Sequence, residues 1–329
     1  MNVNDKTLNW LLEENNPSVR YYTMTYLLGA EVNHSELVEA KKQIMLSGAV
    51  KEILDFQNDD GSWGNPDKFY TMKYKGTAWQ LLILAELGAD PEDDRVQNAC
   101  EFILKMSQAS EDGGFSVEHG KKNDAGLPSK VIPCLTGNMT WTLIKLGYLK
   151  DDRVQSSIDW IVKNQRADDG DKPKLPKWAY ENRVACFSSH TCFMGIVKSL
   201  KALSAIPIEL RSDDVKTKID ELVEFILIHH IYKKSHELNR DAKPGWKRLG
   251  FPLMYQTDIL EILTILIDLD IKDKRMDDAL ALLKSKQLSD GRWKLENTYN
   301  GKFVVDIEKK GEPSKWITLK SMYVLNNNK

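Results

Sequence analysis

Apolar residues recur every three or four positions along most of the chain, which predicts helices, and these helices come in pairs. The paired helices begin at about residues 17 and 36, 77 and 94, 136 and 152, 191 and 213, and 257 and 275, and a last helix begins at about 314. In three pairs a glycine follows the first helix (Gly29, Gly88 and Gly147), and a glycine after the last turn is a typical helix stop. The pattern therefore predicts a chain of helical hairpins.

The residues at the N-terminal end, or head, of the first helix of each pair recur at a regular spacing along the chain. Ser18, Thr77, Thr136, Thr191, Thr257 and Ser314 are 59, 59, 55, 66 and 57 residues apart. A period of this length with two helices per unit is typical of a repeat fold. The hydroxyl at each head predicts an N-cap for the free N–H groups of its own helix. Because six hairpins can close into a ring, we predict an all-α fold, an (α/α)6 toroid that forms one domain over residues 1–329.

The two helices of a pair differ in polarity. Residues 79–85 are apolar on nearly all sides, which favours a place inside the ring, whereas residues 94–106 are rich in charge and suit the outside. Every connection from an outer helix to the next inner helix then falls on one face of the ring. We therefore expect the heads of the inner helices to surround a single mouth.

A second repeated pattern closes the outer helices. Gln-x-x-Asp-Gly-x-Trp occurs at residues 57–63 and 287–293, with looser copies at 108–115 and 165–170. The glutamine amide can bond backbone groups of a neighbouring helix end, the glycine allows a positive φ, and the tryptophan covers the joint. The pattern resembles the glutamine–tryptophan repeats of squalene cyclases and the related turns of protein prenyltransferase β-subunits. The resemblance covers nearly the whole chain and implies the α/α toroid of the terpenoid cyclase and prenyltransferase superfamily.

The activity motifs of those families match this chain poorly. Class II terpene cyclases protonate their substrate with an Asp-x-Asp-Asp motif, which is absent here; the nearest match is the single acid Asp258 at the head of the fifth inner helix. Prenyltransferase β-subunits bind zinc through Asp-Thr-Cys at one helix head and a histidine at the next. By this resemblance His190 corresponds to the aspartate of the motif and Cys192 to its cysteine. Gln256 stands at the position of the histidine. It implies Cys192 and Asp258 as candidate catalytic residues.

Four residues near two neighbouring helix heads form a candidate metal site. Cys186, His190 and Cys192 lie within seven residues, and Cys134 lies two residues before the head at Thr136. Thiolate and imidazole are ligands that a tetrahedral zinc ion takes. We therefore predict a zinc site at Cys134, Cys186, His190 and Cys192. The alternative is that the cysteines are small apolar core residues and the histidine is a cap.

A basic segment precedes the fifth inner helix. It contains Lys233, Lys234, His236, Arg240, Lys243, Lys247 and Arg248. Such a segment at the mouth of an apolar cavity suits an isoprenoid diphosphate or another anionic ligand with an apolar tail. Three aromatic residues near the inner heads, Trp79, Trp141 and Tyr255, are expected to line the cavity and to stabilise a carbocation. The alternatives are a solvated loop and ordinary core packing.

Two functions follow from these features. The first is a prenyltransferase-like or terpene-cyclase-like enzyme that acts on an isoprenoid in the central cavity, and the second is a non-catalytic toroid that binds a lipid or a protein. Carbohydrate-active (α/α)6 barrels rank last, because they need a pair of catalytic carboxylates and the inner heads offer only Asp258 and Glu261.

Composition adds limits on partners and location. A net charge of −2 gives no global field for nucleic acid or an anionic membrane, so we expect a small-molecule partner, and a partner subunit is left open. Residues 1–9 are polar and lack the apolar stretch of a signal peptide, and no apolar run is long enough to span a membrane. With four cysteines, this predicts a cytoplasmic, reducing compartment.

Overall fold

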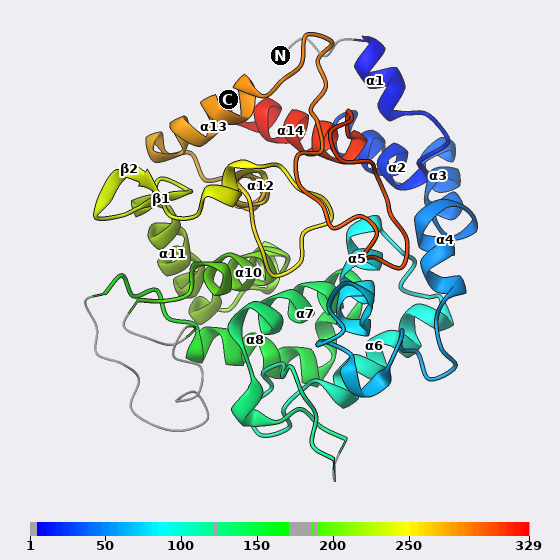
Figure 1. Ribbon diagram of the computed structural model, residues 1–329, viewed down its shortest axis with the longest axis vertical. Helices are drawn as coiled ribbons and strands as arrows, with labels where there is room; N and C mark the ends of the chain where they lie inside the picture. Colours follow the sequence, from blue (N-terminus) through cyan, green and yellow to red (C-terminus); the bar gives the residue numbers. More distant parts are fainter. Residues whose placement is uncertain (1–4, 122–123, 171–185, 187–189, 329) are drawn as a thin grey trace.

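The computed structural model describes residues 5–121, 124–170, 186 and 190–328, and these are mostly helical. Figure 1 shows the helices arranged around a centre in two sets. Nearer the centre are α2 (Pro17–Tyr26), α5 (Thr77–Leu87), α7 (Pro133–Lys145), α10 (Phe193–Ser204), α12 (Ile259–Asp268) and α14 (Lys315–Asn327). Farther out are α1 (Asp5–Leu11), α3 (Ser35–Leu46), α4 (Gly48–Asp55), α6 (Asp94–Met106), α8 (Asp152–Asn164), α11 (Asp213–Ile228) and α13 (Asp277–Ser285).

Short elements complete the described structure. A small antiparallel hairpin of β1 (Lys233–Lys234) and β2 (Glu237–Asp241) follows α11. Single 3-10 turns are η1 (Pro66–Lys68), η2 (Lys73–Lys75), η3 (Pro128–Lys130), η4 (Tyr148–Lys150), η6 (Ile208–Leu210), η7 (Pro244–Lys247) and η8 (Lys274–Met276).

The central and outer helices differ in burial as the sequence predicts. Every residue of α5 except Glu86 is buried, whereas α6 buries one face and exposes the other. The central helices contact one another in chain order: α5 packs on α7, α7 on α10, α10 on α12, α12 on α14, and α14 on α2. The α7–α10 contact is close because an added Cβ on Gly137 would lie 2.4 Å from the backbone carbon of Lys198.

The ends of the described chain meet. Thr7 of α1 donates a hydrogen bond of 2.9 Å to the carbonyl oxygen of Asp290, and Nζ of Lys315 lies 2.8 Å from Oε2 of Glu13. One hydrophobic cluster extends from Leu11 to Val324. The first and last parts of the described chain therefore share one core and pack against each other.

The repeated turns are built as their sequence predicts. Nε2 of Gln57 donates to the carbonyl of Gly61 at 3.0 Å and to that of Arg95 at 2.8 Å, which ties the turn to the start of α6. Gly61 has a φ of +84°, and Nε1 of Trp63 donates to the carbonyl of Ile53 at 2.8 Å. The other copies repeat this pattern in part: Gln108 bonds Gly113 and Arg153, and Gln287 bonds Gly291.

The hydroxyls at the helix heads have a different role from the one predicted. Oγ1 of Thr77 accepts a hydrogen bond from the backbone N–H of Trp63 at 3.0 Å, not from its own helix. Thr136 and Thr191 accept in the same way from the turns that precede them. Of the six predicted heads, Ser314 caps its own helix, through the N–H of Ile317. The prediction of N-caps was therefore wrong at Thr77, Thr136 and Thr191, where the hydroxyl joins the helix to the preceding turn.

The predicted second helix is also divided. The sequence pattern over residues 36–56 predicts one helix, and the structure has α3 and α4, with Ser47 extended and Gly48 at a φ of +68° between them. A positive φ does not fit the interior of a right-handed helix, so the chain changes direction at Gly48 and α4 begins there.

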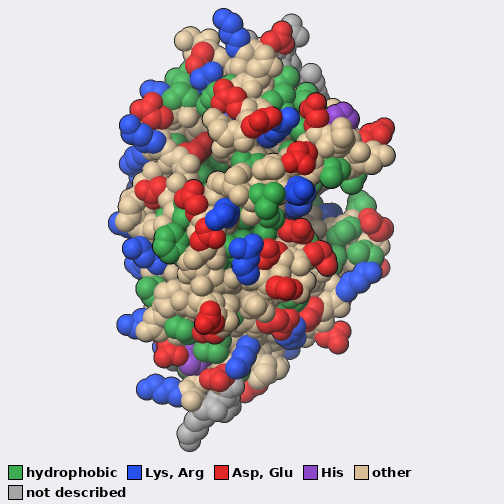
Figure 2. Space-filling model, turned by 90° about the vertical axis from the view of Figure 1, so that its right-hand side faces the viewer, with side chains coloured by type: hydrophobic (Ala, Val, Ile, Leu, Met, Phe, Trp, Pro, Cys, Tyr) green, Lys and Arg blue, Asp and Glu red, His purple; other side chains and the backbone are tan. Residues whose placement is uncertain are grey.

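Figure 2 shows the side of the molecule formed by α1, α3, α4 and α6, and positive and negative side chains are interspersed over it. This distribution agrees with the small net charge of the chain. Within the residues described, no helix is both long and apolar enough to cross a membrane.

Candidate functional site

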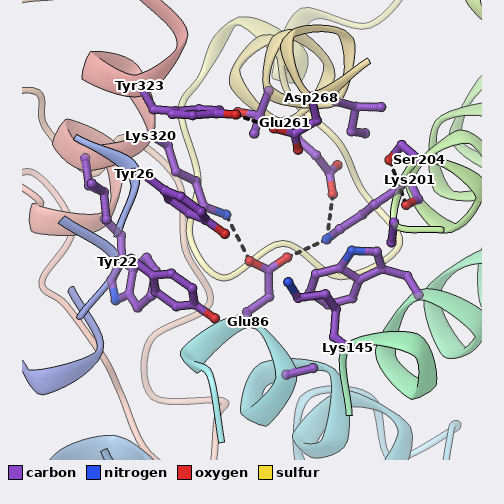
Figure 3. Close-up of a pocket in the computed structure, with 17 residues that line it drawn as sticks. Tyr22, Tyr26, Glu86, Lys145, Lys201, Ser204, Glu261, Asp268, Lys320 and Tyr323 are labelled. Atoms are coloured by element: carbon purple, nitrogen blue, oxygen red, sulfur yellow. Dashed lines mark hydrogen bonds and ion pairs between the residues drawn. The ribbon is translucent and has the colours of Figure 1, made fainter. Parts of the chain in front are cut away.

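A cavity of about 180 Å³ lies between the central helices (Figure 3). We call it the central cavity. All six central helices contribute to its wall, through Tyr22, Tyr26, Ala85, Glu86, Trp141, Lys145, Lys201, Ser204, Ala205, Glu261, Thr264, Ile265, Asp268, Trp316, Leu319, Lys320 and Tyr323. The wall thus combines aromatic rings with acidic and basic groups.

Most of the central cavity lies toward the C-terminal ends of the central helices, away from the predicted mouth. Tyr26, Lys145 and Asp268 are the last residues of their helices, and Glu86 is the last but one of α5. At the other end, the heads of the central helices are covered by the loops before α12 and α14, which cross the centre of Figure 1. The rings of Tyr74 and Tyr299 stack there with centroids 4.3 Å apart. The expectation of a cavity surrounded by helix N-termini was therefore wrong for the central cavity.

Buried charges from four helices meet at this cavity. Lys201 of α10 is hydrogen-bonded to Oε1 of Glu86 on α5, and its Nζ lies 3.3 Å from Oε1 of Glu261 on α12. Lys320 of α14 donates to Oε2 of Glu86 at 2.9 Å. Lys198, which is fully buried, donates to both oxygens of Glu261 at 2.7 and 2.6 Å. These pairs tie α5, α10, α12 and α14 together through their side chains.

Two carboxyl groups at the cavity differ in their acidity. Burial raises the pKa of Glu86, but Lys201 and Lys320 lower it more, so its pKa lies well below the usual range. Burial raises the pKa of Asp268, and this prevails although its hydrogen bond from Tyr323, of 2.7 Å, and the nearby lysines act in the other direction. Two carboxyl groups whose surroundings push their pKa values apart are an arrangement that acid–base catalysis uses.

Of the predicted aromatic and acidic residues, one lines the central cavity and three do not. Trp141 lines the central cavity, and Nζ of Lys201 lies 3.8 Å from the centre of its ring. Trp79 and Tyr255 pack against each other, with ring centroids 6.1 Å apart, and neither lines the cavity. Asp258 is buried as the N-cap of α12, where its two oxygens accept hydrogen bonds from the backbone N–H groups of Glu261 and Gly250. It does not reach the central cavity either.

A second, more open pocket of about 910 Å³ lies at the head of α10, and we call it the lateral pocket. Its wall is made by the residues before and at the start of α10, the end of α11, and the segment that carries the β-hairpin: His190, Thr191, Cys192, Phe193, Met194, His229, Lys234, Ser235, His236, Glu237, Ala242, Lys243 and Trp246. The structure therefore brings Lys234, His236 and Lys243 of the predicted basic segment beside His190 and Cys192.

Three other residues of the basic segment are held in ion pairs. Lys233 contacts Asp278, Lys247 contacts Asp241 at 2.6 Å, and Arg240 contacts Glu237 at 3.0 Å. The segment, including Arg248, contributes nothing to the wall of the central cavity, so the charges expected at the mouth of that cavity lie elsewhere. The basic groups of the central cavity are instead Lys145, Lys201 and Lys320.

The four predicted zinc ligands are divided between two places. The thiol of Cys186 hydrogen-bonds to Cys192, and this bond and the first backbone N–H groups of α10 lower the pKa of Cys192 to about 6, although burial opposes them. Burial, and the nearby charge of Cys192, raise the pKa of Cys134 to about 12. His190 instead faces Asp169, with 2.9 Å between Nε2 and Oδ1. The low pKa of Cys192 suits a nucleophile, and its catalytic role stays a prediction.

Sequence reasoning missed Glu86, Lys201, Asp268 and Lys320. The signal was a single charged residue inside an otherwise apolar helix, as at Glu86 in the run from Thr77 to Leu87. Such a residue must find a partner on another helix, since an isolated buried charge is costly. Hydrophobic periodicity identifies a helix, but it does not tell which other helix carries the partner of its buried charge.

Comparisons with known proteins reveal only distant likenesses. No protein-family model matches the chain, and no curated protein sequence matches it. Among solved structures, it is similar to a variant of the type II terpene cyclase MstE from Scytonema, bound to geranylgeranyl dihydroxybenzoate, with 15% identity, a TM-score of 0.43 and 99% of each chain covered. A glycosyl hydrolase of family 88 from Bacteroides vulgatus has 10% identity and a TM-score of 0.44, with 95% of this chain and 90% of that one covered. Likenesses this distant say nothing about the activity of this chain.

Proposed function

We propose that the chain is a toroid of six helical hairpins whose central cavity binds a short isoprenoid with an anionic head, and that Asp268 protonates it. The observation that supports this proposal is the wall of the cavity. It combines the rings of Tyr22, Tyr26, Trp141 and Trp316 with the carboxyl group of Asp268, whose pKa is raised. A carboxylic acid can donate a proton to an alkene, aromatic faces stabilise the carbocation that results, and loss of a proton from a neighbouring carbon to the carboxylate completes the reaction.

The charges of the cavity favour an anionic head. Lys198, Lys201 and Lys320 stand against Glu86 and Glu261 in the buried network, so three positive groups face two negative ones. Lys145, at the end of α7, is exposed at the edge of the cavity and adds a further positive charge. A phosphate group at this edge would form charge-assisted hydrogen bonds with lysine.

The volume limits the ligand. The cavity of about 180 Å³ is small, so we take a single isoprene unit as the shortest ligand that suits it. Burial of five carbons contributes about 4 kcal/mol at roughly 0.8 kcal/mol each, which by itself gives only millimolar affinity. The head must supply the remaining affinity.

Calorimetric titration with dimethylallyl diphosphate and with dimethylallyl alcohol tests the binding. We expect the diphosphate to bind at least about tenfold more tightly, since a hydrogen bond to a charged group contributes about 1.5–3 kcal/mol. Lys145→Ala should remove most of this difference, and Lys163→Ala, an exposed lysine at the end of α8, is the matched control. Equal binding of the two ligands would rule out the anionic head.

Turnover is tested separately. The diphosphate is incubated with the protein in deuterated water, and deuterium on a carbon atom of the product reports protonation of the alkene. Asp268→Asn should abolish incorporation and retain binding, whereas Asp270→Asn should leave both unchanged. Tight binding with no deuterium in any variant would make the protein a non-catalytic isoprenoid carrier, which is the second function that the sequence indicated.

A further inference from the structure

Three side chains from separate parts of the chain converge beside the lateral pocket. Asp169 follows α8, His190 precedes α10, and His229 follows α11. One donor atom from each of the three lies within 4.8 Å of the other two. Oδ1 of Asp169 is 2.9 Å from Nε2 of His190 and 3.5 Å from Nε2 of His229.

The protons of the two imidazole rings are placed by backbone carbonyl groups. Nδ1 of His229 lies 2.7 Å from the carbonyl oxygen of Phe225, and Nδ1 of His190 lies 3.3 Å from that of Thr191. A carbonyl oxygen only accepts, so these contacts favour a proton on each Nδ1. Nε2 is then the nitrogen of each ring that can bind a metal, and a backbone carbonyl on the opposite nitrogen is the usual orientation of a histidine that does so.

Asp169 supplies the negative charge. Its side chain is 9% exposed, and Oδ1 accepts no hydrogen bond within the described part of the chain, even though both Nε2 atoms are close. Two imidazole nitrogens and one buried carboxylate oxygen therefore lie close together. A cation bound between them would neutralise the carboxylate and satisfy Oδ1.

The cluster is held by rigid surroundings. Residues 169 and 190 form an antiparallel backbone bridge, and the N–H of Thr191 donates to the carbonyl of Asp168 at 2.9 Å. The ring of His229 stacks on Phe225 with centroids 4.3 Å apart and packs edge-on against Phe193 at 5.0 Å. The donors are thus positioned by the fold before any ion binds.

We propose that Asp169, His190 and His229 bind a divalent transition-metal ion, with zinc as the ion that these donors suit best, and that His236 positions Asp169. Zinc lies about 2.0–2.1 Å from nitrogen and oxygen ligands, so neighbouring ligands in a tetrahedron are roughly 3.3 Å apart. The separations of 2.9 and 3.5 Å bracket that value. The site is independent of the central cavity and shares only His190 with the set of ligands that the sequence predicts.

His236 reaches the cluster from the loop between β1 and β2. Its Nε2 lies 3.1 Å from Oδ2 of Asp169 and also 3.1 Å from the carbonyl oxygen of that residue. The contact with the carbonyl oxygen requires a proton on Nε2, so His236 holds Asp169 in place and does not bind the ion through this atom. It links the β-hairpin to the site in this way. Lys234 and Lys243, which line the same pocket, add positive charge around it.

Zinc binding by the whole protein tests the site. The protein is treated with a chelator and titrated with zinc chloride in a calorimeter, and the bound metal is counted by mass spectrometry. We expect one zinc ion per chain. Asp169→Asn and His190→Gln, which preserve size, should each weaken binding by at least about 100-fold, since loss of an outer-shell partner alone costs about 10–100-fold. His236→Ala should weaken it less, and His34→Ala, an exposed histidine before α3, should have no effect.

Cobalt spectroscopy distinguishes these ligands from the cysteines. Cobalt bound to a thiolate has a strong charge-transfer band in the near ultraviolet, and cobalt bound only to nitrogen and oxygen lacks it. We expect no such band, and the same spectrum in Cys186→Ser. Circular dichroism of each variant confirms that it is folded. A charge-transfer band that is lost in Cys186→Ser, or zinc binding that is unchanged in Asp169→Asn, would overturn the proposal.

Discussion

Single side chains at the turns of this protein have partners that their position in sequence does not reveal. Thr77 stands at the head of a helix, as a capping residue does, yet its hydroxyl accepts the N–H of Trp63 in the preceding turn. Asp258, at another head, does cap its helix through the N–H of Glu261. The residue type predicts that a backbone donor will be satisfied. The local φ and ψ of the head decide which donor it is.

The glycine of the repeated turn is expected to be irreplaceable for a steric reason. Gly61 has a φ of +84°, and a Cβ there would lie 2.5 Å from the carbonyl oxygen of Asn98. Gly301 has a φ of +78° with no atom within 4 Å of such a Cβ in the described structure. Gly301→Ala should cost about 1–2 kcal/mol for the left-handed conformation alone. Gly61→Ala should cost about 1–3 kcal/mol more, because backbone must move. Equal losses in urea unfolding would show that the contact with α6 is unimportant.

Asp258 is expected to make folding stability depend on pH. Burial raises its pKa from 3.8 to about 7, although the N–H groups of Glu261 and Gly250 act in the other direction. The folded state then binds the proton more tightly than the unfolded state, so this contribution is fully present below pH 4 and is lost as the pH rises to about 7. The loss is at most about 4 kcal/mol, at 1.36 kcal/mol per unit of pKa. In Asp258→Asn the free energy of unfolding should lack this decline between pH 4 and 7. A parallel decline in both proteins would contradict the raised pKa.

At the scale of the elements, the central helices are distinguished by the charges that they bury. Lys198 on α10 and Glu261 on α12 are both buried inside apolar helices. An amphipathic pattern does not explain them, because these helices are covered on nearly all sides. Each buried charge is tolerated because the neighbouring helix carries the opposite charge within hydrogen-bonding distance.

The pair of Lys198 and Glu261 allows a sharp test of this coupling. Glu261→Gln should destabilise the protein by about 3–5 kcal/mol, because it leaves the ammonium of Lys198 buried without its partner. Lys198→Met should cost less, since Glu261 keeps Lys201 at 3.3 Å. The double variant should cost less than the sum of the two in urea unfolding. Additive losses would mean that the two side chains do not stabilise each other.

At the scale of the whole molecule, the arrangement of the loops decides where a ligand can enter. The loops before α12 and α14 cover the heads of the central helices. Tyr299, in the loop before α14, stacks on Tyr74, which lies before α5. The central cavity is consequently at the C-terminal ends of these helices. The lateral pocket at the head of α10 is separate from it and shares no lining residue.

The shared core predicts that the protein unfolds as one unit. A single hydrophobic cluster includes residues from Leu11 to Val324, and α14 packs on α2. Amide hydrogen exchange of α5 and of α14 should therefore report the same opening free energy, close to the value from urea unfolding. Lys315→Ala, which removes the contact with Glu13, should lower both equally. Exchange in which α14 opens at a much lower free energy than α5 would instead indicate two separable units.

The sequence alone determined the local features of this protein. The period of about 59 residues, the glycine stops and the Gln-x-x-Asp-Gly-x-Trp turns predicted helices and turns that the structure contains, since these depend on neighbours a few residues apart. The break at Gly48 was missed, because a helical pattern continues through it. Of the candidate residues, Cys192, His190, Lys234 and Lys243 line one pocket, the lateral pocket.

Only the tertiary structure decided which charged groups meet. Asp169, His190 and His229 are separated by up to 60 residues in the chain, and Glu86 and Lys320 by 234. Hydrophobic periodicity reports which face of a helix is buried and contains no information on the height at which two helices cross. The position along its axis at which one helix contacts another depends on the packing of all the central helices. It decides which residues form the ion pairs of the central cavity and which donor atoms converge beside the lateral pocket.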